Sequence, residues 1–185
     1  MRRFILTILT ILLCGAALSA QQAAGVAFAD KPAVLTSVGQ SADIEMVRVL
    51  LTRAKIPFRS DAQLQANGLG SDDKTLILVI GGSSKGLGAA GISTEDEMKR
   101  SQALVKKARD MGMKIIAVHV GGEARRGSLS DGFIKFAVPE SDYVIVVSDG
   151  DKDGLFTNLT KEAKIPCDKV DKISSVGAPL AAAFK

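Results

Sequence analysis

Two adjacent arginines and a single histidine mark the segment with the clearest chemical potential. His119, the only histidine, lies near the end of an apolar run, and Arg125 and Arg126 follow a Gly-Gly turn shortly after it. A guanidinium can hold a carboxylate or a phosphate through two parallel hydrogen bonds. Ser130 and Asp131 begin an expected helix whose N–H groups can also attract an anion, although Asp131 can instead pair with an arginine and orient it. The segment therefore predicts an anion site, with a buried strand histidine beside two surface arginines as the competing interpretation.

A second, glycine-rich segment, GGSSKGLGAAG over residues 81–91, can supply donors to the same anion. Glycines let backbone N–H groups approach a ligand closely. Ser83, Ser84 and Lys85 add hydroxyl groups and one positive charge. A mobile surface loop with a solvated lysine is the alternative.

Part of this segment matches the G-x-x-x-G-x-G nucleotide loop of short-chain dehydrogenases. In that family the helix starts within the motif, whereas we expect residues 81–92 to form a long loop, followed by a helix capped at Ser93 or Thr94. The chain also lacks a Tyr-x-x-x-Lys pair, because its only tyrosine, Tyr143, lies in an expected strand. Lys85 is not followed by the Ser or Thr of a phosphate-binding P-loop. We therefore predict neither nucleotide site.

Apolar runs alternate along the chain with segments of helical periodicity, which is typical of an α/β protein. The expected strands cover residues 33–38, 75–80, 114–120 and 143–147, with a short edge strand at 58–60. The expected helices cover residues 41–55, 93–111, 130–137, 155–164 and 175–184. Four strong strands separated by helices predict a mainly parallel sheet in a three-layer sandwich, flavodoxin-like or Rossmann-like.

Ligands of such open sheets bind beyond the carboxyl ends of the strands. The loops expected there carry most of the glycine and functional side chains. The predicted ligand-binding residues are Gly39, Gln40, Ser41, Gly82, Ser83, Ser84, Lys85, Gly86, His119, Gly121, Gly122, Arg125, Arg126, Ser130 and Asp131. No catalytic residue is assigned, and His119 is only a candidate general base.

Metal and cofactor sites are not indicated. Asp149, Asp151 and Asp153 alternate as in calcium loops, but the glycine and distal glutamate of an EF-hand are missing. We expect this acidic loop to be a solvated turn that caps the next helix. One histidine and one cysteine cannot supply a usual zinc site. No cofactor is predicted.

The N-terminus has the features of a signal peptide. A basic start precedes an apolar run from Phe4 to Leu18, which is short for a membrane span. Cleavage after Ala29 would assign residues 1–29 to the signal peptide and 30–185 to one domain, with cleavage after Ala20 as the alternative. A retained membrane anchor is the competing interpretation.

Cleavage would remove Cys14 and leave Cys167, which we interpret as a small, semi-buried apolar residue. Loss of Arg2 and Arg3 would leave 22 basic and 20 acidic residues, a net charge of +2. Such a balance, without a long basic run, does not indicate nucleic-acid binding.

The glycine-rich loop GGSSKGLGAAG and the loop HVGGEARRGSLSD, within this α/β pattern behind a signal peptide, resemble a family of small exported bacterial proteins. That family is a domain of unknown function, DUF6305. The resemblance covers the chain from about Lys31 to the end, and it implies that Lys85, His119, Arg125, Arg126, Ser130 and Asp131 belong to one site. It implies no activity.

Three functions follow as hypotheses. The leading one is a periplasmic or extracytoplasmic protein that binds a small anionic solute, a carboxylate or a phosphate, with an envelope transporter or other envelope protein as a further partner. The membrane would be contacted only through the signal peptide before cleavage. The second is a hydrolase or transferase with His119 as base and Ser83, Ser84 or Ser130 as nucleophile. The third is a non-catalytic envelope interaction module, which an exposed apolar patch on the helix 178–184 would favour.

Overall fold

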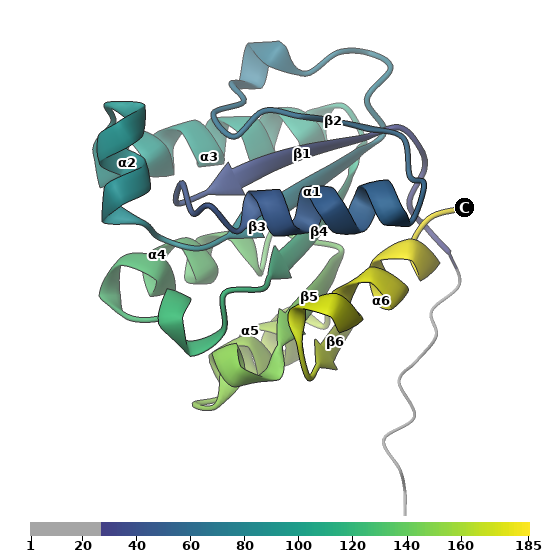
Figure 1. The fold of residues 1–185 in the computed structure, drawn as a ribbon. Helices are drawn as coiled ribbons and strands as arrows, with labels where there is room; N and C mark the ends of the chain where they lie inside the picture. The colour runs from purple at the N-terminus through teal and green to yellow at the C-terminus, as the bar shows by residue number, and fades with distance from the viewer. Residues whose placement is uncertain (1–26) are drawn as a thin grey trace, which may run out of the picture.

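Six parallel strands form the middle layer of the computed structural model, which describes residues 27–185 (Figure 1). They are β1 (Ala33–Val38), β2 (Phe58–Ser60), β3 (Thr75–Ile80), β4 (Lys114–His119), β5 (Tyr143–Val147) and β6 (Cys167–Val170). Their order in the sheet is β2-β1-β3-β4-β5-β6. The first five strands follow the flavodoxin-like order, in which the switch point lies between β1 and β3. β6 was not predicted, because its four residues include the polar Asp168 and Lys169.

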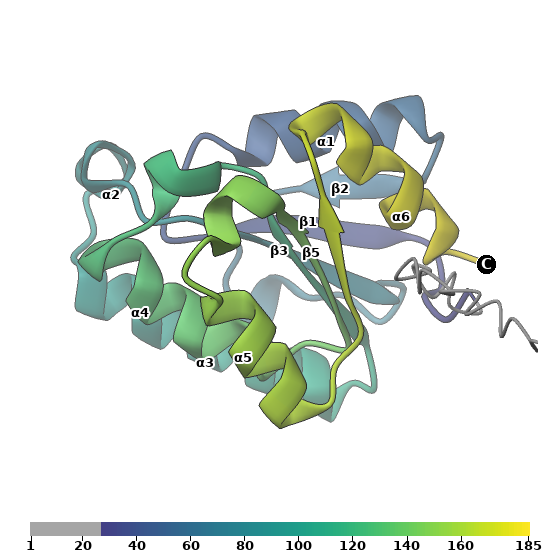
Figure 2. The same cartoon turned by 90° about the horizontal axis from the view of Figure 1, so that it is seen from below.

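Helices cover both faces of this sheet (Figures 1 and 2). α1 (Ile44–Arg53) and α6 (Gly177–Ala182) pack on one face, while α3 (Thr94–Asp110), α4 (Ser128–Ala137) and α5 (Leu155–Ala163) pack on the other. The predicted three-layer sandwich with a parallel sheet is therefore confirmed.

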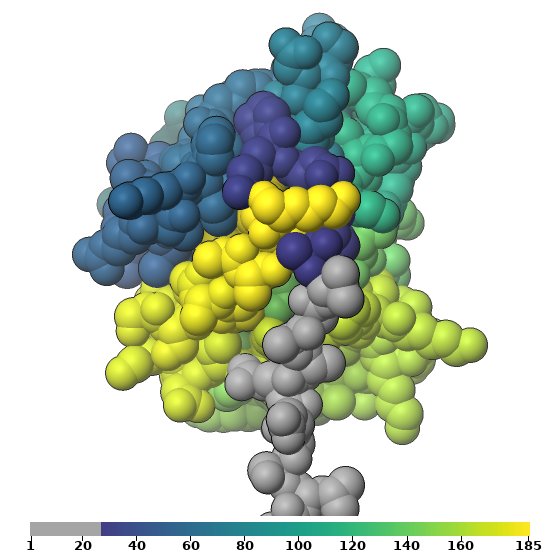
Figure 3. Space-filling model, turned by 90° about the vertical axis from the view of Figure 1, so that its right-hand side faces the viewer, coloured from purple at the N-terminus to yellow at the C-terminus, as the bar shows by residue number. Residues whose placement is uncertain are grey.

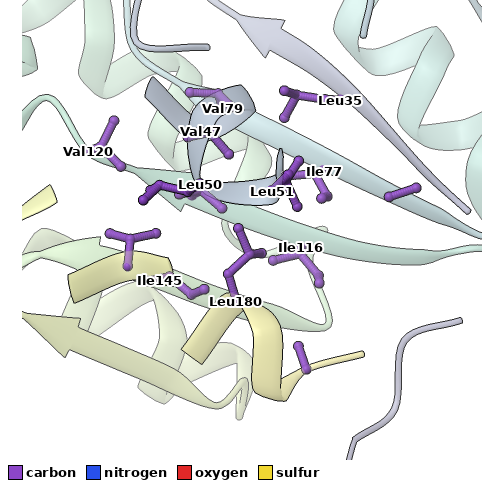
Figure 4. Close-up of a cluster of buried hydrophobic side chains, with 14 of the residues drawn as sticks. Leu35, Val47, Leu50, Leu51, Ile77, Val79, Ile116, Val120, Ile145 and Leu180 are labelled. Atoms are coloured by element: carbon purple, nitrogen blue, oxygen red, sulfur yellow. The ribbon is translucent and has the colours of Figure 1, made fainter. Parts of the chain in front are cut away.

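Alternate strand residues supply the two halves of the core. Leu35, Ile77, Ile116 and Ile145 face α1 and α6, where they meet Leu51 (Figure 4). The residues next to them in sequence face the opposite layer. Strands buried on both sides read as continuous apolar runs, and each such side chain removed from water contributes about 1.5–3 kcal/mol.

Several helix ends differ from their expected positions. α1 begins at Ile44, after the expected start, because Ser41 lies in a preceding turn in which its Oγ accepts a hydrogen bond from the Asp43 N–H at 3.2 Å. The helix ends at Arg53. α4 begins at residue 128, two residues early. The segment expected to form one C-terminal helix instead forms a 3₁₀ turn (Ile173–Val176) followed by α6. α3 ends one residue before its expected boundary, and Ser93 caps it together with Asp96 in a capping box.

The prediction of a long loop over residues 81–92 is wrong, because α2 (Ser84–Ala90) forms there. Ser83 caps this helix by accepting a hydrogen bond from the Gly86 N–H, Leu87 is buried, and Gly91 ends the helix in a left-handed conformation with φ +68°. The many glycines of residues 81–91 favoured the loop prediction over these helix signals. Because this helix starts within the glycine motif, a delayed helix start no longer argues against a dehydrogenase loop. The missing Tyr-x-x-x-Lys pair still argues against it.

Both ends of the described chain meet at the amino edge of the sheet, opposite α2 (Figure 1), and lie against each other on the surface (Figure 3). Ala29 is fully buried and pairs with Phe184 in a parallel bridge, and the ring of Phe28 lies edge-on to Tyr143. Thr75 donates a hydrogen bond to the Asp30 carbonyl at 2.7 Å. A chain cut after Ala29 would lack the contacts of Phe28 and Ala29. Most of the predicted signal peptide lies outside the described residues, and its cleavage site stays a prediction.

Candidate functional site

The loops that follow β1 and β3 are bonded to each other at the carboxyl edge. The Gly81 N–H donates to the Val38 carbonyl and the Ser83 N–H to the Gly39 carbonyl, both at 2.9 Å. Gly39 has φ +101°, and a Cβ there would lie 2.6 Å from the Gly81 oxygen. Two further predicted residues, Gln40 and Gly82, form an antiparallel bridge. The switch point of the sheet is therefore bridged by backbone contacts.

A buried ion pair that sequence reasoning missed holds the first of these loops. Glu97 and Arg100, one turn apart on α3, are paired at 2.7 Å with side chains 0% and 5% exposed. Glu97 accepts hydrogen bonds from the Gly39 N–H at 2.9 Å and from Gln40 Nε2 at 3.1 Å. Their helical spacing with the buried Leu104 was the available signal, since it places both residues on the inner face of the helix.

Arg100 uses its remaining donors on the surrounding backbone. It donates to the Leu64 carbonyl at 2.7 Å and to the Ser37 carbonyl at 2.5 Å. Buried charges are tolerated when they are paired and fully hydrogen-bonded. This buried pair therefore fixes the loop after β1 and serves the fold.

His119, at the end of β4, is fully buried between two loops. Its Nδ1 lies 2.9 Å from the Ile80 carbonyl oxygen and its Nε2 lies 3.2 Å from that of Gly122. The ring also rests against Phe156, with centroids 5.0 Å apart. Burial lowers the pKa of this imidazole, and the two carbonyls oppose that shift only in part. His119 thus joins the loops after β3 and β4, and its hydrogen-bond partners include neither a serine nor a carboxylate.

Arg126 is engaged by two carboxylates. It pairs with Asp131 and with Asp153, at 2.8 Å in each case, and it also donates to the Gly150 carbonyl. These hydrogen bonds raise the pKa of the guanidinium and lower the pKa of Asp153 to about 2. The prediction that Arg126 supplies charge to an anion loses its basis, and the alternative in which Asp131 pairs with an arginine is the one observed.

Arg125 has a different environment from its neighbour. Its only ion pair within residues 27–185 is with Asp43, whose Oδ2 lies 3.6 Å from the arginine Nε, beyond hydrogen-bond distance. The arginine side chain is 34% exposed. Its stem lies over Gly121, where a Cβ would collide with Arg125 Cβ and lie 2.5 Å from Asp43 Oδ2. Glycine at 121 therefore allows this close approach.

Asp43 was not predicted as a site residue, although it lies at the centre of the carboxyl edge. A Cβ on Gly81 would be 3.1 Å from Ser41 Cβ and 3.4 Å from Asp43 Oδ2. Ser41, Asp43, Gly81, Gly121 and Arg125 thus surround one place where the loops after β1, β3 and β4 meet. An acidic residue just before a helix resembles an ordinary cap, so the sequence gave no separate signal for it.

The other predicted residues are distributed around this place. Ser130 is buried and its Oγ accepts a hydrogen bond from the Gly82 N–H at 2.9 Å. Gly86 packs so closely on the Gln40 carbonyl that any Cβ would collide with it. Ser84 and Lys85 are exposed on α2, and within residues 27–185 the side chain of Lys85 forms no hydrogen bond or ion pair. The structure therefore does not unite all six residues that the family resemblance grouped.

The three aspartates of the loop after β5 all form ion pairs with basic residues of the chain. Asp149 pairs with Lys152, Asp153 with Arg126, and Asp151 with Lys169, while Asp151 also caps α5 through the Phe156 N–H at 2.7 Å. The expected capping role is confirmed, but the loop is not simply a solvated turn, because the side chain of Asp151 is fully buried. No group of three or more potential metal ligands occurs within residues 27–185.

Cys167 is half-buried at the edge of the core, which agrees with its expected packing role. Burial raises the pKa of its thiol to about 11. The thiol therefore stays protonated at neutral pH and is a weak nucleophile.

A comparison with protein families matches residues 30–184 to a domain of unknown function, DUF6305. The chain belongs to this family. The match covers the described domain from Asp30 to Phe184 and therefore includes every residue of the carboxyl-edge site. Comparisons with curated proteins and with solved structures gave no significant match. Among the described residues, no helix combines the length and apolar character needed to span a membrane.

Proposed function

We propose that this DUF6305 protein binds a small anionic solute, a carboxylate or a phosphate, at the carboxyl edge of its sheet. The single observation that carries the proposal is Arg125, whose partly exposed side chain lies at the meeting point of three loops and whose acidic partner Asp43 is too distant for a hydrogen bond. A guanidinium in such a position can form two hydrogen bonds with an anion. Export, inferred from the pattern of residues 1–29, would place this binding outside the cytoplasmic membrane.

Two features of the fold support this location. Ligands of doubly wound sheets bind at the carboxyl edge near the switch point, and the loops after β1, β3 and β4 meet there. Helices that follow parallel strands direct their N-termini toward this edge, where their partial positive charge favours anions.

The test compares ligand binding by Arg125→Ala with binding by Arg53→Ala. Arg53 is exposed in the last turn of α1, at the opposite end of that helix, so its removal makes the same chemical change away from the site. Native mass spectrometry and thermal shift would screen a panel of small carboxylates and inorganic phosphate. Arg125→Ala should weaken binding about tenfold or more, as expected for loss of a charge-assisted hydrogen bond, and Arg53→Ala should bind normally.

Equal binding by the two variants and the unmodified chain would contradict the proposal. So would the absence of any bound anion across the panel.

The alternative functions gain no specific support. A general base needs a lone pair that faces the substrate, whereas the ring of His119 is enclosed and both nitrogens face backbone carbonyls. The proposed interaction patch on residues 178–184 is not observed in the expected form, because Leu180, Ala183 and Phe184 are buried. Within residues 27–185, the exposed large apolar side chains are Met46 and Val49 on α1, two single side chains of the kind that ordinary protein surfaces carry.

A further inference from the structure

Asp43 has an unusual position for an acidic residue at the start of a helix. It occupies the N-cap of α1 but makes no side-chain hydrogen bond to that helix. An N-cap aspartate ordinarily accepts a hydrogen bond from the second or third backbone N–H of its helix. The Asp43 carboxylate instead lies beside Gly81 and Gly121, in the loops that follow β3 and β4.

One oxygen of this carboxylate lacks a hydrogen-bond donor. Asp43 Oδ2 is buried and has no hydrogen-bond partner among the described residues, and Arg125 Nε remains 3.6 Å away. Buried polar atoms are nearly always hydrogen-bonded, because an unpartnered one has lost its water without compensation. Such an atom at the carboxyl edge of the sheet therefore has capacity for one more donor.

A second unpartnered group lies on the same side of the sheet. Ser37, near the end of β1, is fully buried, and its Oγ also has no hydrogen-bond partner among residues 27–185. Ser37 lies two residues after Leu35, which faces α1, so its side chain lies on the α1 face of the sheet as well. Both unpartnered atoms therefore lie on the side of the sheet that α1 covers.

The Arg125 side chain lies beside Asp43 and is weakly held there. Its stem passes over Gly121 next to Asp43 Oδ2, it is 34% exposed, and the contact with Asp43 is its only ion pair in the described chain. A rotation of this side chain toward solvent would move its guanidinium away from the Asp43 carboxylate. An anion bound to Arg125 would then lie close to a negative charge, which disfavours a simple anion and favours a ligand that carries a cationic donor as well.

We propose that the ligand is a zwitterion of the amino-acid class, whose carboxylate binds Arg125 and whose ammonium group binds Asp43. This inference rests on the proposed anion site and specifies its ligand class. The ammonium group would provide the hydrogen-bond donor that Asp43 Oδ2 lacks, and the two charges of the ligand would separate the arginine from the aspartate.

The experiment uses matched ligands that differ by one charged group. Calorimetry on the purified chain would compare each standard amino acid with the carboxylic acid that lacks its amino group and with the amine that lacks its carboxylate. At least one amino acid should bind about tenfold more tightly than either of its matched partners. Asp43→Asn, which keeps the shape and capping ability of the side chain, should remove this advantage and leave carboxylate binding equal or tighter.

The outcomes separate the two proposals. If carboxylic acids bind through Arg125 but amino acids bind no more tightly, or if Asp43→Asn leaves the preference unchanged, the zwitterion inference is wrong and the anion site stands. If no member of the three sets binds, the zwitterion inference is wrong, and the anion site then stands or fails on the binding of inorganic phosphate. The melting temperature of Asp43→Asn, which should equal or exceed that of the unmodified chain, shows that the variant is folded.

Discussion

The Glu97–Arg100 pair and the Asp43–Arg125 pair lie at the same edge of the sheet and use the same two chemical groups. Glu97 and Arg100 are buried, have side-chain atoms 2.7 Å apart, and form hydrogen bonds with three backbone groups, those of Ser37, Gly39 and Leu64. Asp43 and Arg125 are 3.6 Å apart, partly exposed, and leave a carboxylate oxygen without a donor. The comparison shows that hydrogen-bond saturation, rather than charge or location, distinguishes the structural pair from the pair to which we assign ligand binding.

Arg125 and its neighbour Arg126 differ in the same way. It adjoins Arg125 in sequence, yet its guanidinium is held by two carboxylates and a backbone carbonyl. Its side chain is 12% exposed, compared with 34% for Arg125. Two neighbouring arginines therefore have opposite roles, one in stability and one in the proposed binding.

Removal of Glu97 should have the largest effect on stability. Glu97→Ala leaves Arg100 as a buried, uncompensated charge and frees the Gly39 N–H, so the free energy of unfolding should fall by about 3–5 kcal/mol. Urea unfolding would measure the change. Glu95→Ala, at an exposed position in the first turn of the same helix, is the matched control and should cost less than about 1 kcal/mol. Similar losses for the two variants would show that Glu97 is not the centre of a structural cluster.

Removal of Arg126 should have an intermediate effect. Arg126→Ala deprives Asp131 and Asp153 of their shared partner, and urea unfolding at neutral pH should show a loss of about 1–3 kcal/mol.

The same variant should alter the response to acid. Because Arg126 lowers the pKa of Asp153 from its ordinary 3.8 to about 2, this pair stabilises the fold above about pH 4 and ceases to do so as the pH falls through 2. Unfolding measured between pH 4 and pH 2 should therefore depend less steeply on pH in Arg126→Ala than in the unmodified chain. An unchanged slope would contradict the assigned partner of Asp153.

Removal of Arg125 should have the smallest effect on stability. Arg125→Ala breaks only a long, partly exposed contact, so the free energy of unfolding should change by about 0.5 kcal/mol or less. The same urea titration would compare it with Arg126→Ala. A loss as large as that of Arg126→Ala would place Arg125 among the structural arginines and weaken the proposed binding role.

The sequence by itself determined the layered architecture and the edge at which a site should lie. The apolar runs at 75–80 and 143–147 are strands with those bounds, because strands covered on both faces need apolar residues throughout. The short edge strand at 58–60 and the capped start of α3 were also predicted correctly, since their turn and capping residues act locally.

Only the tertiary structure decided the strand order and which charged side chains are occupied. The sequence shows Arg125 and Arg126 as equals, but their partners Asp43 and Asp153 lie 82 and 27 residues away along the chain, in loops that only the folded sheet brings together. Hydrogen-bond saturation depends on such long-range contacts and on the donors and acceptors that surround each atom in space. A local pattern of residue types contains neither, and for that physical reason Asp43 and Glu97 came to light only in the fold.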